Sequence, residues 1–143
     1  MNRGIGVNGF IVNDGKFLLV KRADNDDFLP GVWEIPGGKL EIDESCEEGT
    51  TREVLEETGL DVEIVSIISN WEYNHDSGYT RFVQLDFLCE AKNHEVKLSE
   101  EHSDYAWITF DDLDNYKISQ EVKEDLLKIR SHPLVQQLTK TTG

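Results

Sequence analysis

The pattern of apolar and polar positions predicts a protein built mainly of β-strands. Apolar, β-branched stretches at residues 5–12 and 16–21 flank Asn13-Asp14-Gly15, and Asp-Gly between two such stretches is typical of a β-hairpin. The same reasoning predicts strands at residues 33–35, 62–70, 80–90 and 105–110, of which 80–90 alternates over the greatest length. A polar and aromatic loop or hairpin tip is expected at residues 71–78, and a loop at residues 39–44.

Two segments have helical spacing instead. Ser45 and Glu48 match a capping box, and they predict a helix over Cys46–Thr58 that stops at Gly59. A second helix is expected over Gln120–Arg130, and a short turn or helix after residue 110. Strands interleaved with helices predict an α/β or α+β fold with a mixed sheet between helices. The residues after 138 are expected to fray.

The length and net charge of the chain limit the number of domains and the kinds of partner that it can bind. The 143 residues, 38% of them hydrophobic, predict one domain over residues 1–143. The net charge of −15 argues against binding to nucleic-acid polymers or anionic membranes, which requires a basic surface. A small phosphorylated substrate remains compatible, because a bound metal reverses the local charge. No apolar run approaches the roughly 20 residues that span a bilayer, and no signal peptide is expected.

Cysteine usage indicates the redox environment. Cys46 and Cys89 are far apart and form no CxxC pattern, so free thiols in a reducing cytosol are expected. The predicted location is therefore cytoplasmic.

Three carboxylates on the first predicted helix suggest a metal site. Glu53, Glu56 and Glu57 stand at i, i+3 and i+4, which places them on one face of a helix. Like charges at this spacing repel, and a divalent cation would remove the repulsion. Oxygen ligands of this kind suit Mg²⁺, with Mn²⁺ as the second choice.

The residues around this cluster have distinct expected roles. Gly37-Gly38 permits close approach of the backbone to a ligand, and a carbonyl there can face a metal. Arg52 is placed to pair with Glu44 in the preceding loop. Gly49 costs a helix about 1 kcal/mol relative to alanine, which indicates a close packing contact. Val54 and Leu55 are expected in the core.

This arrangement resembles the Nudix box. A glycine, five residues, glutamate, seven residues, Arg-Glu, an aliphatic residue, one residue, Glu-Glu, one residue, glycine and an aliphatic residue follow in order. The fixed positions are filled by Gly38, Glu44, Arg52, Glu53, Val54, Glu56, Glu57, Gly59 and Leu60. Outside the box, residues 33–38 (WEIPGG) are similar to the strand that leads into it in MutT-like members, and the likeness spans roughly residues 5–130.

The resemblance implies an α/β/α sandwich and an activity. The Nudix family hydrolyses a nucleoside diphosphate linked to another group, by attack of water on phosphorus, and it requires a divalent metal, normally Mg²⁺. By position, Glu53, Glu56, Glu57 and the Gly38 carbonyl would be metal ligands, while Glu44 and Arg52 would orient the helix. The general base would be Glu53 or, as the second choice, Glu101 in a later loop.

Substrate contacts are expected outside the box. Arg22, Glu34 and Lys39 are the candidates for contact with the nucleotide. Stacking on a base is considered for the segment with Trp71, Tyr73, His75 and Tyr79, and a base pocket for Phe28 and Leu29, with ordinary packing as the alternative for both groups.

Hydrolysis of a nucleoside triphosphate to the monophosphate and pyrophosphate is the leading hypothesis. The alternatives are hydrolysis of a dinucleoside polyphosphate, ADP-ribose or a nucleotide sugar, and a sensor that binds a nucleotide without cleaving it. The sequence leaves the number of metal ions and a homodimer open.

Overall fold

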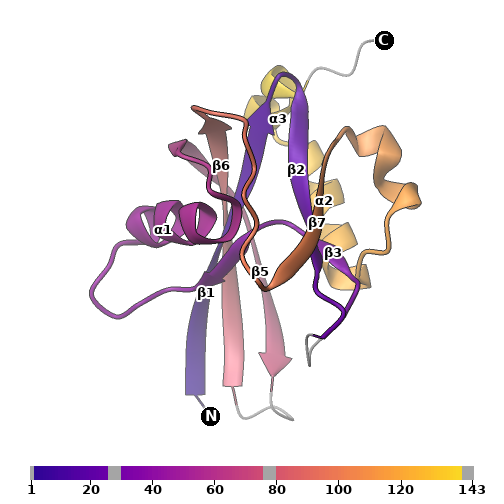
Figure 1. The fold of residues 1–143 in the computed structure, drawn as a ribbon. Helices are drawn as coiled ribbons and strands as arrows, with labels where there is room; N and C mark the ends of the chain where they lie inside the picture. The colour runs from indigo at the N-terminus through magenta and orange to yellow at the C-terminus, as the bar shows by residue number, and fades with distance from the viewer. Residues whose placement is uncertain (1, 26–29, 76–79, 140–143) are drawn as a thin grey trace.

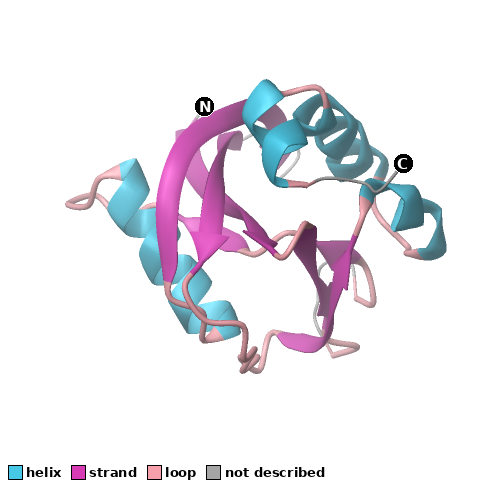
Figure 2. Cartoon of the chain, turned by 90° about the horizontal axis from the view of Figure 1, so that it is seen from above, coloured by secondary structure: helices cyan, strands magenta, loops and turns pink. Residues whose placement is uncertain are grey.

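A mixed β-sheet lies between helices on its two faces in the computed structural model, which describes residues 2–25, 30–75 and 80–139. Figures 1 and 2 show α1 on one side of the strands and α2 and α3 on the other. The elements are β1 (Asn2–Asn13), β2 (Lys16–Arg22), β3 (Trp33–Glu34), β4 (Gly37–Lys39), α1 (Cys46–Thr58), β5 (Val62–His75), β6 (Thr80–Ala91), β7 (His102–Ile108), the 3₁₀ helix η2 (Phe110–Asn115), α2 (Gln120–Arg130) and α3 (Pro133–Leu138). The predicted α/β sandwich with a mixed sheet is confirmed.

Strand β1 organises the sheet, whose order is β3-β2-β1-β6-β5. The strand pairs in parallel with β6 along its length and antiparallel with β2 next to the connecting turn. Asp14 and Gly15 in that turn have φ values of 55° and 82°, the left-handed conformation that a type I′ hairpin requires. Farther from the turn β1 pairs with β4 instead of β2. The chain from β3 to β4 therefore occupies the space where β1 and β2 separate.

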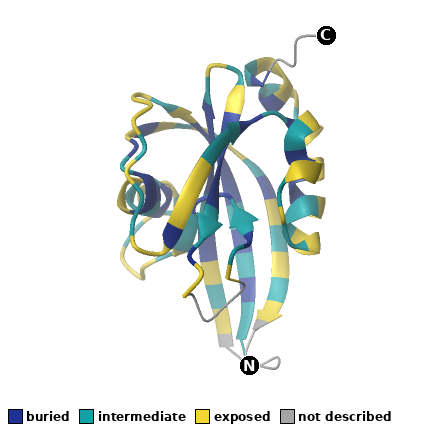
Figure 3. Cartoon of the chain, turned by 45° about the vertical axis from the view of Figure 1, so that its right-hand side comes forward, coloured by how far each residue is buried: buried dark blue, intermediate teal, exposed yellow. Residues whose placement is uncertain are grey.

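Alternation along β1 builds a core on each face of the sheet. Phe10 and Val12 belong to the cluster under α2 and α3, whereas Val7 and Ile11 belong to the cluster under α1. Figure 3 shows buried residues on the inner side of α2 and exposed residues on its outer side.

Helix α1 has the predicted bounds and the predicted caps. The Ser45–Glu48 capping box is complete, and Gly59 at the C-terminus has a φ of 72°. A Cβ at Gly49 would lie 2.9 Å from Glu44 Oε1 and closer still to Leu40, so the expected close packing is confirmed. The prediction that Leu55 belongs to the core was wrong, because it faces solvent on the outer side of α1 with 53% of its surface exposed.

The prediction of a loop or hairpin tip at residues 71–78 was wrong for residues 71–75, because these residues continue strand β5. This part of β5 pairs with β6 from Trp71 opposite Gln84 to His75 opposite Thr80. Cross-strand contacts support the extension, since the rings of Tyr73 and Phe82 stack with centroids 5.5 Å apart. The polar composition of residues 71–75 suggested a loop, but pairing with the long strand β6 makes this segment a strand.

Other boundaries also differ from the predictions. Gly37–Lys39 forms strand β4 by pairing with β1, so the expected loop begins after Lys39. Strand β7 ends at Ile108, and Phe110 begins η2. The short helix α3 was not foreseen, and it buries Thr139, which was expected to fray. Strand β4 depends on pairing with β1, whereas η2 and α3 begin at local caps, the Thr109–Asp112 capping box and His132 followed by Pro133.

Two further expectations concern the whole chain. None of the helices in the described ranges is long and apolar enough to cross a membrane. Cys46 and Cys89 are both free thiols, as predicted, and Cys89 is buried.

Candidate active site

The glycine pair between β3 and α1 allows the helix to approach the sheet closely. A Cβ at Gly38 would overlap the carboxylate of Glu53, so a larger residue would displace that side chain. The backbone N–H of Gly37 donates to Glu57 Oε2 at 3.2 Å. The glycines thus place two of the predicted ligand carboxylates against the backbone of β4.

Arg52 holds the loop before α1 against the helix. Its Nε and Nη2 donate to the two oxygens of Glu44 at 2.9 and 2.6 Å, and Nη1 donates to Glu53 Oε1 at 2.8 Å. The Arg52 guanidinium, together with the backbone N–H of Glu41, lowers the pKa of Glu44 to about 2. The predicted Arg52–Glu44 pair is therefore present, and the same arginine also orients Glu53.

The three box carboxylates differ strongly in burial. The side chain of Glu56 is 59% exposed, that of Glu53 is 15% exposed and that of Glu57 is 5% exposed. Burial, with added repulsion from Glu34 and Glu53, raises the pKa of Glu57 to about 9. Burial is also the main cause of the raised pKa of Glu53. Burial therefore disfavours the ionised form of the two deeper carboxyls, Glu53 and Glu57.

Glu101 and His102 reach the same place from the start of β7. Side-chain ligand atoms of Glu57, Glu101 and His102 lie within 4.8 Å of one another. His102 Nε2 is 3.0 Å from Glu34 Oε2, while Nδ1 is 3.7 Å from Glu57 Oε1 and has no hydrogen-bond partner among the described residues. The side chain of His102 therefore lies buried between the carboxylates of Glu34 and Glu57.

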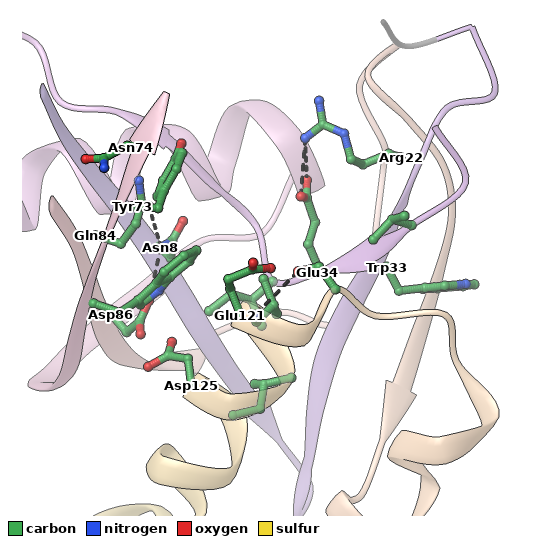
Figure 4. A pocket seen from close by; sticks show the side chains of 16 residues that line it. Asn8, Arg22, Trp33, Glu34, Tyr73, Asn74, Gln84, Asp86, Glu121 and Asp125 are labelled. Atoms are coloured by element: carbon green, nitrogen blue, oxygen red, sulfur yellow. Dashed lines mark hydrogen bonds and ion pairs between the residues drawn. The ribbon is translucent and has the colours of Figure 1, made fainter. Parts of the chain in front are cut away.

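Arg22, Glu34 and Lys39 line one groove beside the carboxylates. Both oxygens of Glu34 accept from Arg22 Nη1 at 3.2 Å, an interaction drawn in Figure 4. Lys39 Nζ lies 5.6 Å from the centroid of the Phe82 ring. The groove has a volume of about 320 Å³ and includes Gly37 and Gly38 in its wall. Three residues predicted to contact substrate are thus brought together.

A second cavity, of about 490 Å³, adjoins this groove and shares lining residues with it. Figure 4 shows Asn8, Gln84, Asp86 and Asp125 gathered on one side of it, across from Trp33 and the Arg22–Glu34 pair. Sequence reasoning had not considered these four polar residues. Asn8, Gln84 and Asp86 lie within strands that are otherwise largely apolar, and that break in the pattern is the signal that could have identified them.

Some of the residues considered for contact with a base lie at this cavity, and others lie outside the described part of the chain. Trp71 and Tyr73 line the cavity, with ring centroids 5.4 Å apart. Phe28, Leu29, Tyr79 and the side chain of His75 lie outside the part that the structure describes.

Comparison of the sequence with known protein families gives a match over most of the chain. The NUDIX domain family matches residues 2–128. The chain belongs to the Nudix family. The resemblance based on the box is thereby confirmed, and the protein is a hydrolase of phosphoric anhydride bonds.

Individual relatives support the assignment to the Nudix family. The chain is 35% identical over 126 residues to the nucleoside triphosphatase NudI of Escherichia coli strain K12, covering 81% of this chain and 89% of NudI. It is similar in structure to the MutT protein of Methanosarcina mazei Go1, with a TM-score of 0.81, 29% identity and coverage of 90% and 93%. The MutT Nudix hydrolase of Burkholderia pseudomallei gives a TM-score of 0.75 at 25% identity, covering 91% of this chain and 98% of that one.

Proposed function

We propose that this Nudix hydrolase is a divalent-metal-dependent nucleoside triphosphate pyrophosphohydrolase, which releases a nucleoside monophosphate and pyrophosphate. The observation that carries the proposal is the convergence of Glu53, Glu57 and Glu101 beside a groove that contains Arg22 and Lys39. Similarity to NudI and to MutT proteins supports the triphosphate as the substrate class.

The residues present fit a divalent metal ion. The buried Nδ1 of His102 has no hydrogen-bond partner among the described residues and lies near Glu57 and Glu101, where a cation would satisfy all three groups. We assign Glu53, Glu56 and Glu57, with the carbonyl of Gly38, as ligands of Mg²⁺, for which Mn²⁺ is the second choice, and we add His102 Nδ1 as a further candidate ligand. The bound metal would hold phosphate oxygens and lower the pKa of a water molecule.

The other residues have positioning and proton-transfer roles in the proposal. Arg52 and Glu44 fix the end of the loop and hold Glu53 in place through the hydrogen bonds described above. Glu53, whose pKa is raised mainly by burial, is the first choice for the general base, and Glu101 is the second. Arg22 and Lys39 supply positive charge for the phosphates at the groove, and Glu34 orients Arg22.

The central experiment measures hydrolysis by Glu57→Gln and the wild type with Mg²⁺ and each common nucleoside triphosphate. We expect the variant to lose at least about 100-fold in kcat, because it removes a charge from the ligand set. Glu47→Gln is the matched control, since Glu47 is exposed on the same helix outside the cluster. Equal rates for all three proteins would refute the ligand assignment, and release of phosphate instead of pyrophosphate would refute the reaction.

Two other functions remain as alternatives in this scheme. A panel with ADP-ribose, dinucleoside polyphosphates and nucleotide sugars tests other diphosphate substrates. Nucleotide binding without any product in the same panel would identify a sensor. The proposal also includes a cytoplasmic location, supported by the free thiols Cys46 and Cys89, and leaves a homodimer as a prediction for sedimentation velocity to test.

A further inference from the structure

Three neighbouring strands bring polar side chains onto one face of the sheet, next to α1. Glu34 on β3 is opposite Val20 on β2. His102 on β7 is opposite Arg22, which lies two residues farther along β2. Residues opposite each other in an antiparallel pair share a face, and so do residues two apart along one strand. All three polar side chains therefore lie on the side of Val20, which belongs to the core under α1.

An irregularity in the strand pairing turns His102 to this face. Lys21 on β2 is opposite Asp104 on β7. Regular pairing would then place Ser103 opposite Arg22 and turn His102 to the other face. The register instead shifts between Lys21 and Arg22, so that His102 is opposite Arg22. A β-bulge of this kind changes the direction of a side chain, and bulges are frequent next to active sites.

The buried imidazole of His102 lies between two carboxyl groups. Nε2 is 3.0 Å from Glu34 Oε2, and Nδ1 is 3.7 Å from Glu57 Oε1. A carboxylate only accepts hydrogen bonds, so the contact with Glu34 places the ring hydrogen on Nε2 and leaves the lone pair on Nδ1. Within the described ranges of the chain Nδ1 has no hydrogen-bond partner. It is therefore the ring nitrogen that is available to a metal ion beside Glu57 and Glu101.

Arg22 holds Glu34 in place at the groove. Its Nη1 donates to both oxygens of Glu34 at 3.2 Å, so Oε2 of Glu34 accepts from Arg22 and from His102. A metal-bound histidine commonly donates its other ring N–H to a carboxylate, which fixes the orientation of the ring and strengthens the bond to the metal. Glu34 and His102 have this arrangement, and Arg22 continues it to the groove.

We propose that Glu34 is a positioning residue of the metal site, which accepts the Nε2–H of His102 and thereby keeps Nδ1 available to the cation beside Glu57. The inference rests on the proposed function, because it concerns the same metal site. Glu34 acts through His102 in this role and needs no contact with the metal or with the phosphates of a substrate.

Mn²⁺ binding to the protein without nucleotide tests this role, with the free ion measured by electron paramagnetic resonance. We expect Glu34→Leu to raise the Kd for Mn²⁺ about 10-fold or more, which is the usual cost of removing such a carboxylate. Glu34→Gln retains an acceptor oxygen and should recover most of this loss. Because it removes the same charge as Glu34→Leu, the recovery separates the hydrogen bond from a simple loss of charge.

Glu72→Leu is the matched control for Mn²⁺ binding. Glu72 on β5 also pairs with an arginine, since its Oε1 lies 3.4 Å from Arg81 Nε, and its side chain is partly exposed. We expect this variant to bind Mn²⁺ with the Kd of the wild type. A Kd for Glu34→Leu equal to that of the wild type, or a rise of the same size in Glu72→Leu, would overturn the proposal.

A second measurement reports on the imidazole itself. ¹⁵N NMR of the metal-free protein with labelled histidine shows which ring nitrogen carries the hydrogen, and His102→Gln identifies the signals of His102. We expect the hydrogen on Nε2 in the wild type and in Glu34→Gln, and a mixture of the two forms in Glu34→Leu. The same distribution in the wild type and in Glu34→Leu would also overturn the role of Glu34.

These measurements use no nucleotide, so they separate the inference from the proposed function. If the wild type cleaves no nucleoside triphosphate, the proposed function fails, while a loss of Mn²⁺ affinity in Glu34→Leu but not in Glu72→Leu still supports the role of Glu34. If the wild type releases pyrophosphate and Glu34→Leu binds Mn²⁺ as tightly as the wild type, the role of Glu34 is overturned and the proposed function stands.

Discussion

Replacing Glu57 with glutamine tests the claim that the fold stores an unfavourable charge at the metal site. Burial raises the pKa of Glu57 from its ordinary value of 4.5 to about 9 in the metal-free protein. At about pH 7.5 the unfolded chain ionises this group and the folded chain keeps it protonated, so the native state is disfavoured. The three pH units between 4.5 and about 7.5 correspond to at most about 4 kcal/mol of the free energy of unfolding.

The sign of the pH dependence follows from the raised pKa. The contribution of Glu57 to the free energy of unfolding is most favourable below about pH 4.5, and it falls as the pH rises toward about 9. Glu57→Gln lacks this fall, so we expect it to be up to about 4 kcal/mol more stable than the wild type at about pH 7.5 and similar to it near pH 4. Saturating Mg²⁺ should stabilise the wild type by ligand linkage and the variant much less.

Urea unfolding in EDTA, followed by far-UV circular dichroism at both pH values, measures this difference. Glu47→Gln serves again as the control, because it removes an equal charge from the exposed surface of α1. The reasoning fails if the stability difference between Glu57→Gln and the wild type is the same at both pH values, or if Mg²⁺ stabilises both proteins equally.

Three further predictions concern the surroundings of the cluster. Arg52→Lys cannot form the paired hydrogen bonds to Glu44, so kcat should fall about 10-fold or more, and a kcat equal to the wild type would contradict the role. Gly49→Ala should lower the melting temperature despite the higher helix propensity of alanine, because its Cβ would meet Leu40 and Glu44; a higher melting temperature would contradict this. Mn²⁺ added to the EDTA-treated protein should show ¹⁴N coupling from His102 in pulsed electron paramagnetic resonance, and His102→Gln should abolish it; an unchanged spectrum would exclude the imidazole as a ligand.

Local signals predicted the elements whose ends are defined by neighbouring residues. Helix α1 has the predicted bounds because the Ser45–Glu48 box and Gly59 satisfy its end groups within a few residues. The β1–β2 turn was predictable for the same reason, since Asp14-Gly15 adopts the required positive φ on its own. Strand β4 and the end of β5 were missed, because they exist only by pairing with β1 and β6.

The candidate site also has features that the sequence predicted and features that it did not. Helical periodicity places Glu53, Glu56 and Glu57 on one face of α1. It also places Arg52 where it can pair with Glu44. The sequence alone therefore indicated the part of the site where the phosphate bond is cleaved. Their unequal burial did not follow from spacing, because it depends on how closely β4 packs against α1.

The sequence by itself determined the family, the reaction class and the acidic helix, because these depend on residues close together in the chain. Only the tertiary structure decided that His102 joins Glu57, and that Asp86 meets Asp125 across 39 positions of sequence. The first contact forms because β7 pairs with β2 and brings His102 to α1. The second forms because β6 pairs with β1 and α2 packs over the sheet. Burial then sets the charge of each carboxyl, since the cost of ionisation depends on the dielectric surroundings that the completed fold creates.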